Sequence, residues 1–176
     1  MASMIDRMIR AAKLDIHLYE EVEADKGALG QAMGVVVLAS IAGGFGSGGQ
    51  GGLSGVFIGT IGALIGWFIW ACLTYLIGTK MLPEAQTRAD LGEMLRTIGF
   101  ASSPGLIRLL GLIPGTRGIV LIVSGIWMLV AMIIAVRQAL DYKSTLRSVG
   151  VCMIGWLIQG LVLLLVFQLF PTPGPK

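Results

Sequence analysis

Long runs of apolar residues dominate the chain after its first 28 positions. Five of them lie at about 29–46, 53–79, 95–113, 118–138 and 149–170. Each is close to the roughly 20 residues that an α-helix needs to cross the hydrocarbon layer of a bilayer. The runs are continuously apolar, whereas strands of a membrane barrel alternate over about ten residues. The pattern predicts an all-α, polytopic transmembrane bundle of five spans at 29–170.

Composition supports this interpretation. Charged residues make up 13% of the 176 positions and hydrophobic residues 55%, against about 25% and 45–50% in soluble domains. Residues 27–79 contain no Asp, Glu, Lys, Arg or His. A soluble domain of this size cannot bury such a stretch around a single core, so we expect the chain to face lipid.

Lys and Arg gather at alternate ends of the apolar runs. Ten of them lie before the first run, at or between the facing ends of the second and third runs, or at or between those of the fourth and fifth. Arg117 and Lys176 lie beyond the opposite ends, and Arg108 lies inside the third run. Cytoplasmic loops carry the excess of Lys and Arg in membrane proteins. We therefore expect a multi-pass protein of the cell's inner (cytoplasmic) membrane, with a cytoplasmic N-terminus and an extracytoplasmic tail at 171–176.

Residues 1–28 form a separate charged segment. Its apolar positions recur at steps of three and four: Met4, Ile5, Met8, Ile9, Ala12, Ile16 and Tyr19. This spacing predicts one amphipathic cytoplasmic helix. Its first half is basic and its second half acidic, so we expect the first half to lie on anionic lipid and the second to turn toward water or the basic loops. A solvated helix beside the membrane fits the pattern equally well.

Glycines are frequent within the first two apolar runs and between them. Residues 44–49 read GFGSGG, the spacing of a dinucleotide-binding turn, which also needs an acidic residue about 20 positions further on. The first acid is Glu84, so we interpret 43–52 as an uncharged turn between two spans. Four glycines of the second run have the spacing that lets membrane helices pack closely: Gly55, Gly59, Gly62 and Gly66. They pack either within the chain or against a second copy of it.

The third run, LRTIGFASSPGLIRLLGLIPG, is interrupted near its middle. Pro104 removes a backbone hydrogen bond, and Ser103 can cap a new helix that begins there. The motif predicts a third span that is kinked or broken near Pro104. Arg108 lies six residues before Pro114, or about 9 Å along a helix, so its side chain can reach the outer surface. It is either an anchor at that surface or a contact for an anion or lipid headgroup in a cavity.

Catalytic and metal-binding chemistry has little support in the sequence. The single histidine, His17, lies in the N-terminal segment, and the spans offer no paired acids and no cluster of metal ligands. Cys72 and Cys152 lie in apolar runs, where cysteine acts as a small core residue. We expect no enzymatic activity, no cofactor, no metal and no nucleic-acid partner.

Three segments carry a resemblance to a known family. They read LYEEVEADKGALGQA, LPEAQTRADLGEMLRTIGFASSPGLIRLLGLIPG and WMLVAMIIAVRQALDYKSTLRSVGVCMIGW. The pattern, from about Met4 to Phe170, resembles prokaryotic members of the Yip family, five-span proteins whose eukaryotic relatives interact with Rab-type GTPases. The resemblance implies the same topology that the charges indicate. Eukaryotic members have a longer N-terminal region with a motif of the Asp-Leu-Tyr-Gly-Pro type, which the short segment here lacks, so Rab binding is not carried over.

Two functional hypotheses follow. The first is a non-enzymatic membrane scaffold or adaptor that binds a protein through its cytoplasmic face, with candidate residues Asp90, Glu93, Arg96, Arg137, Asp141 and Tyr142. The second is a small transporter or channel with a site at the broken third helix near Pro104 and Arg108. The scarcity of polar residues inside the spans argues against the second. The expected partners are the lipid bilayer, a protein on the cytoplasmic face and a second copy of the chain.

Overall fold

The computed structural model describes residues 2–46 and 52–169, and every regular element in these ranges is helical. The all-α prediction is therefore confirmed for this part of the chain. The expected tail at 171–176 and the centre of the expected turn at 43–52 lie outside it. The elements are α1 (Met4–Ala12), α2 (Ile16–Ala24), the 3₁₀ turn η1 (Lys26–Ala28), α3 (Leu29–Gly46), α4 (Gly52–Leu76), the π-helical η2 (Ile77–Met81), α5 (Leu91–Phe100), the 3₁₀ helix η3 (Ser103–Leu112), α6 (Arg117–Ala139) and α7 (Thr145–Leu169).

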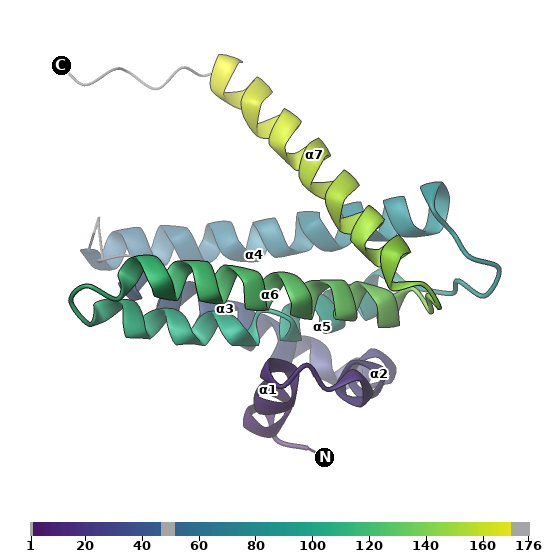
Figure 1. Ribbon diagram of the computed structural model, residues 1–176, viewed down its shortest axis with the longest axis horizontal. Helices are drawn as coiled ribbons and strands as arrows, with labels where there is room; N and C mark the ends of the chain where they lie inside the picture. Colours follow the sequence, from purple (N-terminus) through teal and green to yellow (C-terminus); the bar gives the residue numbers. More distant parts are fainter. Residues whose placement is uncertain (1, 47–51, 170–176) are drawn as a thin grey trace.

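The helices form an elongated bundle with an attached N-terminal pair (Figure 1). Helix α3 packs against α4 on one side and against α5 and η3 on the other, and α6 covers α5 and η3. Helix α7 begins beside the end of α6 and leans away from the bundle. The connections 82–90 and 140–144 lie together at one end of the bundle, which we call the polar end. The turn 113–116 lies at the opposite end.

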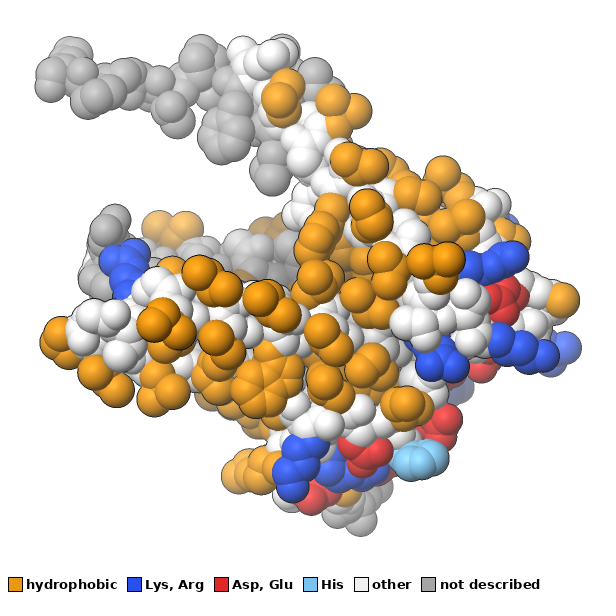
Figure 2. Space-filling model, viewed as in Figure 1, with side chains coloured by type: hydrophobic (Ala, Val, Ile, Leu, Met, Phe, Trp, Pro, Cys, Tyr) orange, Lys and Arg blue, Asp and Glu red, His pale blue; other side chains and the backbone are white. Residues whose placement is uncertain are grey.

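In the part of the chain that the structure describes, four helices are long and apolar enough to cross a membrane: Lys26–Gly46, Gly52–Met81, Arg117–Ala139 and Thr145–Val162. Their large side chains are widely exposed, for example Phe57 (69%), Ile122 (65%) and Leu157 (72%). Figure 2 shows hydrophobic side chains over α6 and α7, while charged side chains gather at the polar end and over α1 and α2. Because water would disfavour an apolar surface of this extent, we assign the chain to the integral membrane proteins.

The third apolar run is not one continuous helix. Helix α5 ends at Phe100, a turn follows, and η3 begins at Ser103 with Pro104 in its first turn. The expectation that Ser103 caps the new helix is wrong. Its hydroxyl donates to the carbonyl oxygen of Phe100 at 2.7 Å, so it closes the preceding helix rather than accepting from the following one.

Glycines bring the backbones of α3, α5 and η3 into close contact. A Cβ at Gly46 would collide with the carbonyl oxygen of Arg108, and a Cβ at Gly111 would lie 2.6 Å from the carbonyl oxygen of Gly46. A Cβ at Gly99 would lie 2.7 Å from the Cβ of Ala32. On α4, in contrast, Gly59, Gly62 and Gly66 each have open space where a Cβ would stand. Close helix packing therefore occurs at glycines of α3, α5 and η3, and not at these three predicted glycines of α4.

The N-terminal segment forms two helices, so the expectation of a single helix is wrong. The chain reverses between α1 and α2, where Leu14 takes a left-handed conformation (φ 61°). The Asp15 side chain then accepts from the His17 amide at 3.0 Å and caps α2. As a result, the apolar positions of the predicted helix are divided between α1 and α2 and differ in burial. Ile5 of α1 is 68% exposed, whereas Tyr19 of α2 is fully buried.

Opposite charges hold the two N-terminal helices together. Arg7 of α1 is buried and donates to Glu21 at 2.9 Å and to Asp25 at 2.7 Å. Arg10 pairs with Asp15 at 2.8 Å and also with Glu21. These bonds from Arg10 and Arg7 lower the pKa of Glu21. The acidic half of the segment thus turns back onto the basic half.

Candidate functional site

Arg96 joins the N-terminal pair to the bundle. It lies on the buried face of α5 and is 5% exposed. Its Nε donates to the carbonyl oxygen of Val22 at 2.9 Å, and its terminal nitrogen donates to that of Glu23. These carbonyls lie in the last turn of α2, where backbone acceptors have no partner within the helix. The structure therefore gives Arg96 an internal role, which the sequence did not indicate.

Asp90 and Glu93 cap the beginning of α5. The Glu93 amide donates to Asp90 Oδ1 at 2.8 Å, and the Asp90 amide donates to Glu93 Oε2 at 2.7 Å. This reciprocal arrangement is a capping box, recognisable as an acid three residues before a Glu at the start of an apolar run. Both side chains still reach the surface at the polar end, where Asp90 is exposed and Glu93 half-buried.

Tyr142 and Arg137 fix the turn between α6 and α7. Tyr142 is 3% exposed, and its hydroxyl lies 2.9 Å from the carbonyl oxygen of Gly78 and 2.7 Å from that of Leu82. Arg137 Nε donates to the Tyr142 carbonyl oxygen at 3.2 Å. Asp141 stands in the left-handed conformation at the same turn (φ 53°) and its side chain is exposed. The structure thus buries Tyr142 and leaves Asp141 accessible.

Glu84 locks the two connections of the polar end together. Its carboxylate accepts from the Lys143 amide at 3.1 Å and the Ser144 amide at 3.4 Å, and it pairs with Arg147 at 3.5 Å. Gln86 also donates to the carbonyl oxygen of Asp141 at 3.1 Å. The sequence did not single out Glu84, because its partners lie about 60 positions away along the chain.

Four carboxylates lie near one another where α2, α5 and the 140–144 connection meet. We call them the acidic patch: Glu20, Glu23, Glu93 and Asp141. Burial, followed by repulsion from Asp141 and Glu93, raises the pKa of Glu23 to about 7, and the nearby Arg96 only partly offsets this. Gln138 of α6 donates to Glu20 at 3.1 Å, so the patch is tied to the bundle.

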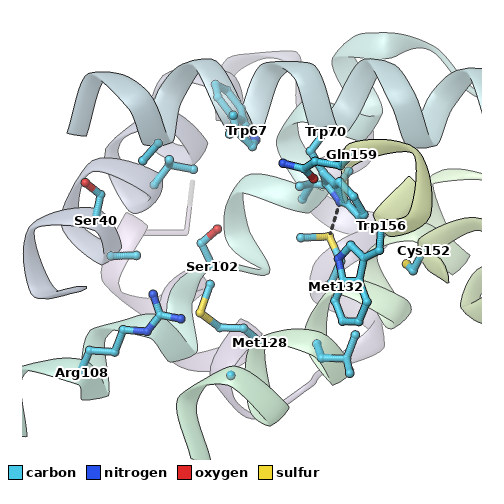
Figure 3. Close-up of a pocket in the computed structure, with 17 residues that line it drawn as sticks. Ser40, Trp67, Trp70, Ser102, Arg108, Met128, Met132, Cys152, Trp156 and Gln159 are labelled. Carbon is cyan, nitrogen blue, oxygen red and sulfur yellow. Dashed lines mark hydrogen bonds between the residues drawn. The ribbon is translucent and has the colours of Figure 1, made fainter. Parts of the chain in front are cut away.

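A second candidate site is a cavity of about 370 Å³ between α3, α4, η3, α6 and α7. Trp67, Trp70, Met128 and Trp156 are among its lining residues, and Arg108 extends into it from η3 (Figure 3). Arg108 Nε donates to Ser124 Oγ of α6 at 3.1 Å. Pro104 is buried at the beginning of η3 and shapes the backbone before Arg108. We call this the Arg108 cavity.

Spacing along the chain does not reveal the Arg108 cavity. Its walls come from helices that are far apart in sequence, so Ser40, Trp67 and Met128 show no shared pattern before the fold is known. Within 2–46 and 52–169 no three His, Cys, Asp or Glu residues are grouped to hold a metal ion. Both cysteines are free thiols, with Cys152 buried and Cys72 half-buried.

Comparison with known proteins agrees with the helical, membrane-embedded architecture. Neither the curated proteins nor the solved structures contain a match to the chain. A family model described as the Yip1 domain matches residues 19–167, which is most of the chain, from α2 to the last turns of α7. The chain therefore belongs to the Yip1 family.

Proposed function

We propose that this Yip-type membrane protein crosses the bilayer five times, with its polar end in the cytoplasm, and acts as a non-enzymatic scaffold or adaptor. Arg88, Lys143 and Arg147 lie at the polar end, and Arg117 lies at the opposite end of the bundle. This excess of basic residues at the polar end supports the orientation. The acidic patch is the observation on which the adaptor role depends, because it gathers four acidic side chains, with Glu20 and Asp141 exposed, at a place that the bonds of Arg96 and Gln138 hold in one arrangement.

The segment α5–η3 is the fifth crossing in this proposal. Ten α-helical residues rise about 15 Å, and ten 3₁₀ residues rise about 20 Å. The sum of about 35 Å exceeds the roughly 30 Å of hydrocarbon in a bilayer. A 3₁₀ helix of this length is unusual, and the glycine contacts with α3 supply the close packing that holds it.

Arg96, Arg137 and Tyr142 make internal hydrogen bonds, so their side chains are not part of the surface that we propose for a partner. These three side chains hold the polar end together, whereas Glu20 and Asp141 are exposed. Helix α2, which carries two of the four carboxylates, is fixed to α5 by Arg96. We infer that the partner is a protein with a basic segment, because opposite charge favours both encounter and selectivity at such a surface.

Neutralising the acidic patch tests the adaptor role. The double variant Glu20→Gln and Asp141→Asn removes two exposed charges, and asparagine tolerates the left-handed conformation at position 141. The matched control is Asp6→Asn, because Asp6 is an exposed carboxylate on α1 outside the patch. All three chains are purified from the native membrane in nanodiscs, and the proteins that accompany them are quantified by mass spectrometry.

We expect the wild type and Asp6→Asn to retain the same protein with a basic segment, and the double variant to lose most of it. Equal retention by all three chains would refute the role of the patch. Retention no greater than that of empty nanodiscs would refute the adaptor function itself.

A further inference from the structure

Arg108 brings a positive charge into the apolar part of the molecule without a neutralising acid. Among the residues that the structure describes, no carboxylate is within ion-pair distance of its guanidinium. A guanidinium carries five N–H donors, and the bond to Ser124 accounts for one. Donors and charge are therefore left for a ligand in the Arg108 cavity.

The side chain of Arg108 points inward. Ser124 lies seven residues from Arg117 at the outer end of α6, or about 10 Å along the helix. On its other side the guanidinium lies beside Gly43 of α3, where an added Cβ would stand 3.5 Å from a terminal nitrogen. An arginine that served only as an anchor would extend toward the outer surface. The observed direction favours the cavity contact over the anchor.

The remainder of the cavity suits a hydrocarbon chain. Trp67 and Trp70 line it across from Arg108 (Figure 3), and Met128 also contributes to its wall. Trp156 of α7 also lines it and is 52% exposed, so the cavity reaches the surface that faces lipid. A volume of about 370 Å³ lies near the lower limit of ligand sites, which suffices for a headgroup and the first part of a chain whose remainder extends into the bilayer.

We propose that the Arg108 cavity binds an anionic phospholipid of the surrounding membrane. Its phosphate bonds to the guanidinium, which matches phosphate oxygens in a bidentate geometry, and its acyl chain passes the tryptophans toward the bilayer. A free phosphate would satisfy Arg108 but leave the apolar walls uncovered. The single negative charge of phosphatidylglycerol neutralises Arg108, whereas the choline group of phosphatidylcholine would add a second cation.

Quenching of tryptophan fluorescence by brominated lipid measures this binding. Three of the four tryptophans, Trp67, Trp70 and Trp156, line the cavity, so a bromine on a bound acyl chain quenches them. The full chain is reconstituted in phosphatidylcholine vesicles that contain either brominated phosphatidylglycerol or brominated phosphatidylcholine. We expect about tenfold preference for phosphatidylglycerol, the effect of a charge-assisted hydrogen bond.

Two pairs of variants test whether the preference for phosphatidylglycerol arises in the Arg108 cavity. Arg108→Gln should abolish the preference, whereas Arg117→Gln, which removes an exposed charge outside the cavity, should keep it. Gly66→Leu should also abolish it, because Gly66 lines the cavity and has space for a side chain. Gly62→Leu adds the same bulk on the same helix outside the cavity and should leave the preference intact.

Several results would overturn the proposal: equal quenching by both lipids in the wild type, the same loss in both members of a pair, or displacement of quenching by inorganic phosphate. The last result would identify a free anion as the ligand. If Arg108→Gln does not fold, the Gly66→Leu and Gly62→Leu pair decides, because neither substitution meets a neighbouring atom at its Cβ.

Discussion

Replacing Gly46 by alanine tests the close contact between α3 and η3. The added Cβ would collide with the carbonyl oxygen of Arg108. This neighbour is a backbone atom, so no side-chain rotation can relieve the overlap, and η3 must move away from α3. Such a movement also weakens the packing of Gly111 against the Gly46 carbonyl oxygen.

The expected cost is at the upper end of the range for overpacking, about 3 kcal/mol, because the colliding atom is rigid. For a chain of this size, 1 kcal/mol shifts the unfolding temperature by about 2–4 °C. Gly46→Ala should therefore lower the unfolding temperature by about 6–12 °C. The same substitution at Gly62 of α4 meets open space and gains up to about 1 kcal/mol of helix propensity, so the temperature should stay level or rise.

Thermal unfolding of both variants in the same detergent, followed by tryptophan fluorescence, gives the comparison directly. Both substitutions add one methyl group: at Gly46 it enters a buried, occupied place at the end of α3, and at Gly62 it enters open space inside α4. Equal shifts for Gly46→Ala and Gly62→Ala would refute the close approach of α3 and η3, and a large loss at Gly62 would show that α4 packs differently.

Three further predictions concern α2 and its contacts. Tyr19→Phe should leave stability unchanged or raise it by up to about 1–2 kcal/mol in thermal unfolding, because the buried Tyr19 hydroxyl has no hydrogen-bond partner in the described chain. A loss would indicate a hidden partner. Arg96→Met should destabilise the chain by about 3 kcal/mol, since it leaves the Val22 and Glu23 carbonyl oxygens without their donor. Hydrogen exchange should localise that loss to α2, whereas the control Arg88→Met at an exposed position should have little effect. Stability should fall as pH rises from about 5 to about 8, because the pKa of Glu23 is raised to about 7 and the folded state holds its proton longer than the unfolded state does. Glu23→Gln should remove this part of the pH dependence, and an unchanged profile would contradict the assignment.

For helices that are apolar along their whole length, the sequence predicted the first and last residues closely. The first apolar run, 29–46, coincides with α3, and the fourth, 118–138, differs from α6 by one residue at each end. A continuous apolar run of this length is typical of a membrane-spanning helix and of few other structures. The break between α1 and α2 was harder to predict, because the apolar spacing of three and four residues continues through the reversal at Leu14. Asp15 as a cap was the local signal that could have indicated the break.

The candidate sites depend on contacts that spacing along the chain does not reveal. Arg96 was expected at a surface for partners, but it bonds to α2 more than 70 positions earlier. Arg108 meets Ser124 only because the 113–116 turn folds α6 back along η3. Glycine spacing pointed to α4, whereas the backbone contacts at Gly46 and Gly99 depend on which helices become neighbours. Composition and periodicity determine which segments are helical, but not how they pair.

The side of the membrane on which the two ends of α5–η3 lie is the most direct test of this account. Single cysteines at Ala85 and at Ile113, both exposed positions at opposite ends of the segment, are introduced into a chain in which Cys72 and Cys152 are replaced by alanine. Intact cells are then treated with a membrane-impermeant maleimide. We predict that Ile113→Cys is labelled in intact cells and Ala85→Cys only after the membrane is permeabilised. Labelling of both positions from the same side would contradict the fifth crossing and the orientation of the polar end.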